Sequence, residues 1–79
     1  MPMAFVFVNA EVGSEDEALR QLRKIESVKE AYGIYGIYAI HDIVARVEVE
    51  TTDRLREVIT SKVRKLRWVR STLTMMVIE

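Results

Sequence analysis

The segment SVKEAYGIYGIYAIHDIVARVEVE, Ser27–Glu50, decides the fold of this 79-residue chain. Its second half, Asp42–Glu50, alternates apolar and polar residues, and this period of two predicts a strand with one buried face. Its first half predicts another strand, from Val28 to about Ile37. Because the two strands are close in sequence, we expect them to pair as an antiparallel hairpin.

A strand and a helix precede this hairpin. Met3–Val12 is rich in aromatic and β-branched residues, and both of its alternating sets are apolar, which favours a strand covered on both faces. Gly13 ends the strand, and Ser14 and Glu17 then have the spacing of a capping box at the start of a helix. The apolar stripe of this helix comprises Ala18, Leu22 and Ile25, with Leu19 beside it.

A second helix and a last strand follow the hairpin. Thr51 or Thr52 can cap a helix whose apolar residues recur at helical spacing as far as Leu66. The segment from Trp68 to Ile78 predicts the last strand. The order is therefore βαββαβ, and the short connections favour an α+β, ferredoxin-like fold. In this fold both helices cover one face of a four-stranded antiparallel sheet.

The other face of that sheet has no helix to cover it. We expect its exposed apolar residues to be Phe5, Phe7, Met76 and Ile78, or the residues that alternate with them. A large bare apolar face usually marks an interface. The sequence therefore predicts a homodimer, an α/β-barrel-like assembly in which two sheets pack face to face or edge to edge.

The composition excludes several classes of function. The length fits a single domain over residues 1–79. The 12 Lys and Arg residues are balanced by 12 Asp and Glu residues, so the chain lacks the overall basic excess of a nucleic-acid-binding protein. Its longest apolar run, Met3–Val8, has six residues, against the roughly 20 that span a bilayer. Without cysteine, the chain suits a reducing compartment, and we expect a cytoplasmic protein with no direct contact to nucleic acid or membrane.

The residues for catalysis are also missing. His41 is the single histidine, and a metal site needs several ligands at a suitable spacing. Gly33 and Gly36 lie in strand-like sequence with no helix directly after them, which is not the pattern of a phosphate-binding loop. We therefore expect no enzyme activity, no metal and no cofactor. A basic cluster near the end of the second helix is interpreted as solvated charge that suits the helix dipole, with contact to an acidic partner as the alternative; its members are Lys62, Arg64, Lys65 and Arg67.

Several motifs occur in a defined order along nearly the whole chain. They are Val28 with Gly36 eight residues later, then Tyr38, the apolar strand DIVARVEV, the helical segment LREVI, and the ending VRSTLTMMVI with Val69, Thr72 and Thr74. Each motif alone is weakly specific. In this order they are similar to the C-terminal effector-binding domain of the Lrp/AsnC family, also called the RAM domain. The resemblance implies assembly through dimers, and in relatives into octamer-like rings.

The resemblance also implies a site for a free amino acid at the contact between dimers. The residues that it implies for ligand binding are Gly36, Ile37, Tyr38, Asp42, Thr72 and Thr74. In such a site Gly36 lets a backbone approach closely, and Asp42 pairs with the ligand's ammonium group. The two threonine hydroxyls donate to its carboxylate.

Two features depart from the family pattern. The family's Asp directly follows its Tyr, whereas Ala39–His41 stand between Tyr38 and Asp42 here and lengthen the turn. Family members also usually carry an N-terminal helix-turn-helix domain, for which we expect no room in this chain. The prediction is thus a non-enzymatic module that senses an amino acid and modulates full-length Lrp/AsnC regulators or metabolic partners. The alternative is a pure assembly module with a degenerate pocket, which the longer turn supports.

Overall fold

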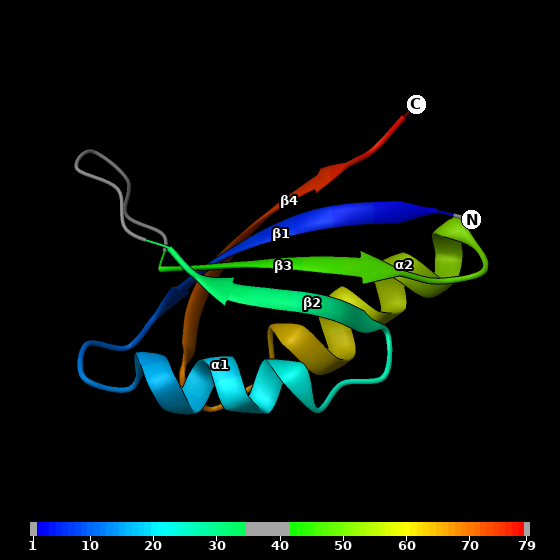
Figure 1. The fold of residues 1–79 in the computed structure, drawn as a ribbon. Coiled ribbons are helices and arrows are strands. Elements are labelled where there is room, and N and C mark those ends of the chain that lie inside the picture. Colours follow the sequence, from blue (N-terminus) through cyan, green and yellow to red (C-terminus); the bar gives the residue numbers. More distant parts are fainter. Residues whose placement is uncertain (1, 35–41, 79) are drawn as a thin grey trace.

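The structure, a computed structural model, describes residues 2–34 and 42–78, which form a sheet with helices on one side (Figure 1). The strands are β1 (Met3–Ala10), β2 (Val28–Gly33), β3 (Ile43–Glu48) and β4 (Val69–Met76). The helices are α1 (Glu15–Arg23) and α2 (Thr52–Val58), and α2 continues directly into a π-helical turn, η1 (Ile59–Val63). The predicted βαββαβ order and ferredoxin-like α+β fold are confirmed.

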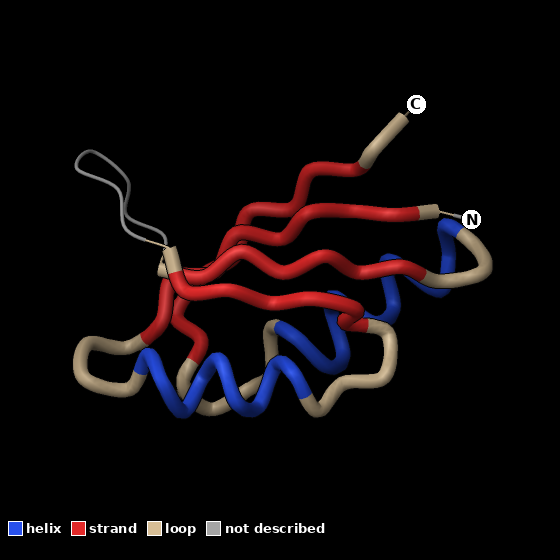
Figure 2. The backbone as a smooth tube through the Cα atoms, viewed as in Figure 1, coloured by secondary structure: helices blue, strands red, loops and turns tan. Residues whose placement is uncertain are grey.

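The four strands pair in the order β2-β3-β1-β4, and all the described pairs are antiparallel (Figure 2). The predicted hairpin is present, with Ala31 opposite Ala45. β1 lies between β3 and β4, so that Val6 has Ala45 on one side and Thr74 on the other. β2 ends at Gly33; Ile34 is not part of the strand, and the rest of the predicted extension to Ile37 lies outside the described residues. β2 and β4 are therefore the edges of the sheet.

The core lies between the sheet and the two helices. Period-two alternation places every second residue of a strand on the same face, and in β1 and β3 that face is fully buried. Its residues are Ala4, Val6, Val8, Ala10, Ile43, Ala45 and Val47. The helices contribute Ala18, Leu22, Leu55, Val58 and Val63. Because these residues are buried between the sheet and the helices, the opposite face of the sheet remains for other contacts.

The two helices begin in different ways. The Thr51 hydroxyl oxygen accepts a hydrogen bond from the backbone N–H three residues later at 3.0 Å, which confirms one of the two predicted caps. Ser14 makes no side-chain cap hydrogen bond, so the predicted capping box with Glu17 is wrong. Neighbours three and four residues apart share a helix face, and Glu17 accepts hydrogen bonds from Arg20 and Gln21 instead.

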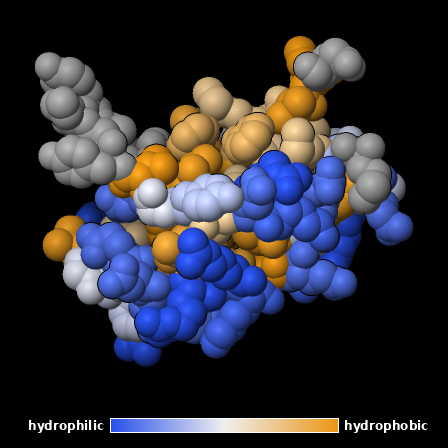
Figure 3. All heavy atoms as spheres, viewed as in Figure 1, coloured by the Kyte–Doolittle hydropathy of each residue, from blue (hydrophilic) through white to orange (hydrophobic). Residues whose placement is uncertain are grey.

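The second face of the sheet carries no helix (Figure 1). Phe5 is 38% exposed and pairs with Met75, which is 55% exposed, while Leu73 is 47% exposed. Figure 3 shows apolar residues gathered on the sheet side of the molecule, opposite a mostly hydrophilic helix side. The residues that alternate with Met76 form this face, whereas Met76 itself pairs with Ala4 on the helix side. The predicted bare apolar face is therefore present, with Leu73 and Met75 as the contribution of β4.

Candidate functional site

The predicted ligand-binding residues fall in two groups. Gly36, Ile37 and Tyr38 lie outside the described residues. The structure describes the other three, which are Asp42, Thr72 and Thr74. Asp42 lies on the β3 side of the central strand β1, and the threonines lie on its β4 side. Asp42 immediately precedes β3, and the two threonines belong to β4.

Asp42 closes the end of the ladder between β3 and β1. Its backbone N–H donates to the carbonyl oxygen of Val8 at 2.8 Å, and its own carbonyl oxygen accepts from the N–H of Ile34 at 2.8 Å. Its Oδ2 atom accepts a hydrogen bond from the backbone N–H of Ala10 at 3.0 Å. Val8 opposite Ile43 is the last pair of this ladder, so the carboxylate supplies the acceptor that a longer β3 would have provided. The Asp42 side chain thus stabilises the fold as well as being a candidate ligand contact.

Thr72 and Thr74 lie on the helix-facing side of β4. Thr72 pairs with Val8 and Thr74 with Val6, and both of these valines are fully buried under the helices. Residues directly opposite each other in a sheet share a face, so both threonines face the helical layer. Both are half-buried, as expected at an edge strand that the helices cover only in part.

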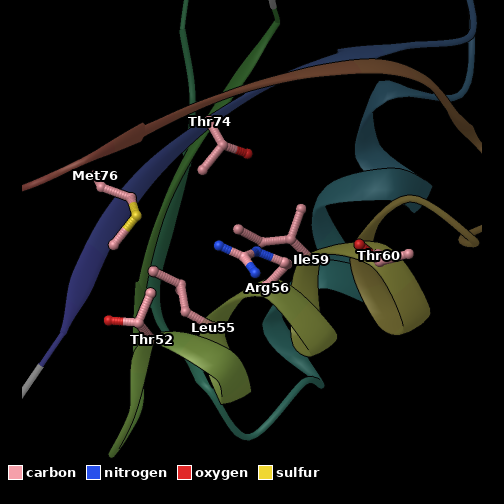
Figure 4. A pocket seen from close by; sticks show the side chains of 7 residues that line it. All are labelled: Thr52, Leu55, Arg56, Ile59, Thr60, Thr74 and Met76. Atoms are coloured by element: carbon pink, nitrogen blue, oxygen red, sulfur yellow. The ribbon is translucent and has the colours of Figure 1, made fainter.

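Thr74 lines a hollow between α2 and β4 that we call the α2–β4 hollow. Its volume is about 180 Å³, and its lining is Thr52, Leu55, Arg56, Ile59, Thr60, Thr74 and Met76 (Figure 4). Apolar side chains line most of its surface. The guanidinium of Arg56 lies over the centre of the hollow, between Leu55 and Thr74 (Figure 4). This arrangement combines an apolar wall with one cation and three hydroxyl groups.

Thr72 lines a second, more polar hollow next to the end of η1. Its volume is about 210 Å³, and its lining is Arg64, Val69, Arg70, Ser71 and Thr72. Two guanidinium groups and two hydroxyls therefore lie within reach of one small polar ligand. The two hollows follow one another along β4, with one candidate threonine in each.

The arginines of both hollows have no acidic partner in the described part of the chain. The ion pairs there are Arg20–Glu17, Arg46–Glu30, Arg46–Glu48 and Arg54–Glu57. Arg56, Arg64 and Arg70 take part in none of them, and no acidic residue among those described lines either hollow. Within residues 2–34 and 42–78, both hollows therefore carry positive charge without an acidic ion-pair partner.

The sequence-based reasoning missed Arg56 as a candidate. One signal was available, because Thr52, Arg56 and Thr60 are spaced four residues apart and so lie along one line of a helix. Arg64 was noted only as a member of the basic cluster, and Arg70 only as a member of the last strand. No residue pattern showed that these cations would lie next to the threonines of β4.

Asp42 and the threonines lie on opposite sides of β1. Neighbouring strands are about 4.8 Å apart, so roughly 10 Å separates β3 from β4 across β1. The ammonium and carboxylate of a free amino acid are attached to the same carbon atom. Asp42 lines neither of the two hollows that contain the threonines, so the described structure does not bring the three predicted side chains together in one hollow.

The described residues also lack two further features, a cluster of metal ligands and a membrane-spanning helix. Residues 2–34 and 42–78 hold no group of three or more His, Cys, Asp or Glu side chains that could bind a metal ion. In the same part of the chain, no helix is long and apolar enough to cross a membrane.

Comparison with known proteins identifies the family. The sequence model described as the Lrp/AsnC ligand binding domain matches residues 3–79. The chain belongs to the Lrp/AsnC ligand-binding domain family. The resemblance to the RAM domain is therefore confirmed over nearly its whole length. No curated protein sequence matches the chain significantly.

Solved structures of this family share the fold. The crystal structure of FFRP-DM1 is 36% identical, with a TM-score of 0.90, and the match covers 99% of this chain and 100% of that one. A hypothetical protein from Pyrococcus horikoshii, PHS023, is 35% identical with a TM-score of 0.89, and the match covers 100% of this chain and 92% of that one. A feast or famine regulatory protein from M. tuberculosis, complexed with L-methionine, is 24% identical with a TM-score of 0.80. The match covers all of this Lrp/AsnC domain but only 51% of that protein.

Proposed function

We propose that this chain is a non-enzymatic module that binds a free amino acid and assembles through its bare sheet face. Membership of the Lrp/AsnC ligand-binding domain family supports the ligand class, and so does the L-methionine complex of the M. tuberculosis relative. The observation that carries the proposal is the hollow between α2 and β4, where Thr74 and an unpaired arginine face an apolar wall.

Assembly is the first part of the proposal. Phe5, Leu73 and Met75 are between 38% and 55% exposed on one continuous sheet face. Burying apolar surface stabilises by about 25 cal/mol per Å², and a domain of this size buries too little of its own surface to be more than marginally stable. Pairing of two such faces supplies the missing burial. A homodimer is therefore the minimal unit, and larger rings form where dimers meet.

The ligand site is the second part. Asp42 lines neither of the hollows that contain the threonines of its own chain, so we place the complete site where the turn of a neighbouring dimer meets them. In the proposed junction, Gly36, Ile37, Tyr38 and Asp42 from one copy close over Thr72 and Thr74 of another. Asp42 pairs with the ammonium group, and the threonine hydroxyls donate to carboxylate oxygens of the ligand. Binding would then couple the amino acid to assembly with full-length Lrp/AsnC regulators in the cytoplasm.

A pure assembly module is the second candidate function, and one observation favours it. The Asp42 carboxylate already accepts a hydrogen bond from the Ala10 N–H at 3.0 Å within its own chain. The three residues Ala39–His41 also lengthen the turn that would deliver Asp42 to a neighbour. In this candidate the oligomer forms and the pocket binds nothing.

Two measurements separate these candidates. Multi-angle light scattering gives the mass of the assembly, and a thermal-shift screen with each of the twenty amino acids tests the site. A ligand at 100 times its Kd stabilises by about 2.7 kcal/mol, which is easily detected for a domain of this size. A thermal shift with at least one amino acid supports the sensing module. An oligomer without any shift selects the assembly module, and a mass near 9.2 kDa contradicts both.

A further inference from the structure

The two hollows along β4 share one electrostatic property. Arg56 in the α2–β4 hollow and Arg64 and Arg70 in the polar hollow have no acidic partner among the described residues. Asp53 lies one turn before Arg56 but is not paired with it, and Glu57 is already paired with Arg54. A ligand that spans both hollows therefore gains most if it brings negative charge to each of them.

The spacing of the two threonines defines the length of such a ligand. Thr72 and Thr74 are two residues apart on one strand, which separates them by about 7 Å. Hydrogen bonds of about 2.9 Å extend from each hydroxyl toward the ligand. A ligand that lies beside the strand meets both hydroxyls only if two of its acceptor groups are several Å apart, and an amino acid with a second carboxylate two or three carbons from the first has such a spacing. A short neutral amino acid reaches one of the two arginine-lined hollows and not the other.

We propose that the effector of this chain is an acidic amino acid, with its two carboxylates held at the two ends of the Thr72–Thr74 row. This inference rests on the proposed function. One carboxylate binds Thr72 with Arg64 and Arg70, and the other binds Thr74 with the guanidinium of Arg56. Arginine binds carboxylates in a bidentate, charge-assisted geometry, which gives both strength and selectivity. The methylene groups lie against the apolar wall of the α2–β4 hollow.

The turn η1 forms part of the wall of the α2–β4 hollow. The N–H of Arg64 donates to the carbonyl oxygen of Ile59 at 2.9 Å, which is the five-residue spacing of a π-helix. This turn forms the C-terminal end of the helix, where wide turns of this kind occur. Ile59 and Thr60, the first residues of this turn, both line the α2–β4 hollow. The irregular turn therefore lies at the wall that the ligand would contact.

The inference also predicts which ligands are rejected. Lysine and arginine bring a cation toward Arg56, and like charges at short distance repel. Neutral amino acids such as leucine or methionine leave Arg56 without a partner. We expect the order of affinity to be acidic first, neutral second and basic last.

The test is isothermal titration of the assembled protein with L-aspartate, L-glutamate, L-leucine, L-methionine and L-lysine, at one pH and one salt concentration. An acidic amino acid should bind most tightly. Arg56→Gln should weaken its binding at least about tenfold, because a charge-assisted hydrogen bond is lost, and Arg56→Lys should restore part of it. The matched control is Arg54→Gln, which removes the same charge from the same helix outside the hollow and should bind like the parent.

The outcomes distinguish this inference from the function on which it rests. If only neutral or basic amino acids bind, the inference is wrong and the sensing module stands. If no amino acid binds, the sensing module itself is wrong. If the acidic amino acid binds Arg56→Gln as tightly as the parent, Arg56 has no part in recognition and the inference is overturned. Arg56 is exposed, so the unliganded melting temperature should show that each variant is folded.

Discussion

Replacing Asp42 separates its contribution to the fold from its proposed contact with a ligand. Its carboxylate accepts the hydrogen bond of the Ala10 N–H at 3.0 Å, at the end of the ladder between β3 and β1. Ala10 is only 2% exposed, so water does not readily replace this acceptor. We therefore expect Asp42→Ala to destabilise the protein even when no ligand is present.

The expected magnitude follows from this one bond. Leaving a buried N–H without its acceptor costs about 1–3 kcal/mol. The bond is only partly buried, so we take the lower part of that range, about 1–2 kcal/mol. For a domain of 60–100 residues each kcal/mol changes the melting temperature by about 4–8 °C. Asp42→Ala should therefore lower the melting temperature by roughly 4–16 °C.

The assay is thermal unfolding followed by circular dichroism, with the protein concentration held fixed because the stability of an oligomer depends on it. Asp42→Asn is the matched control, since its side-chain oxygen can still accept from the Ala10 N–H but carries no charge. We expect Asp42→Asn to melt close to the parent and yet to lose any amino-acid-induced shift. If Asp42→Ala melts like the parent, the structural role assigned to this hydrogen bond is wrong. If Asp42→Asn binds the amino acid as the parent does, the proposed ammonium contact is wrong.

Three further predictions concern the helices, the core and the bare face. In urea unfolding, Thr51→Ala should lower the free energy of unfolding by about 1 kcal/mol because it removes a helix cap. Ser14→Ala should leave that free energy nearly unchanged. Equal losses in the two variants would contradict the caps described. Leu22 is fully buried, so Leu22→Ala should lower the free energy of unfolding by about 2–5 kcal/mol. A smaller loss in the same experiment would contradict the position of Leu22 in the core. Leu73→Glu should shift the mass by light scattering toward the 9.2 kDa monomer while circular dichroism stays native; an unchanged assembly would exclude this face as the interface.

The fold could be predicted because local patterns agree with it at nearly every element. The alternation in Asp42–Glu50 placed Ile43, Ala45 and Val47 on the buried face, where the structure has them. The two-sided apolar pattern of β1 predicted cover on both faces, but within one chain only one face is covered and Phe5 is exposed. Sequence alone does not distinguish cover by the same chain from cover by a partner.

The predicted capping box failed because several neighbouring groups can bond the same carboxylate with similar strength. The spacing of Ser14 and Glu17 fits a capping box, yet Glu17 has Arg20 and Gln21 within one turn of the same helix. Those partners satisfy the carboxylate without the N-terminal backbone. Spacing shows which contacts are possible, and the local geometry decides which of them forms.

The candidate site could be predicted only within single strands. Period-two alternation correctly placed Thr72 and Thr74 on one face of the last strand. The hydrogen bond from Ala10 to Asp42 joins residues 32 positions apart, next to an irregularity of β1 at Asn9/Ala10. Such a contact depends on the register of the sheet and on where a strand stops. No local pattern encodes either, and the position of Arg56 in the same hollow as Thr74 was missed for the same reason.

The central position of β1 has a consequence for folding during synthesis. β1 is the first strand to leave the ribosome, yet its partners are β3 (Ile43–Glu48) and β4 (Val69–Met76). Pairing across such long separations in sequence slows folding, because the entropy of closing the loops is lost before the contacts form. The apolar β1 strand therefore emerges before its second partner exists. Until β4 has also emerged, one edge of β1 is unpaired, and an unpaired apolar strand edge favours aggregation.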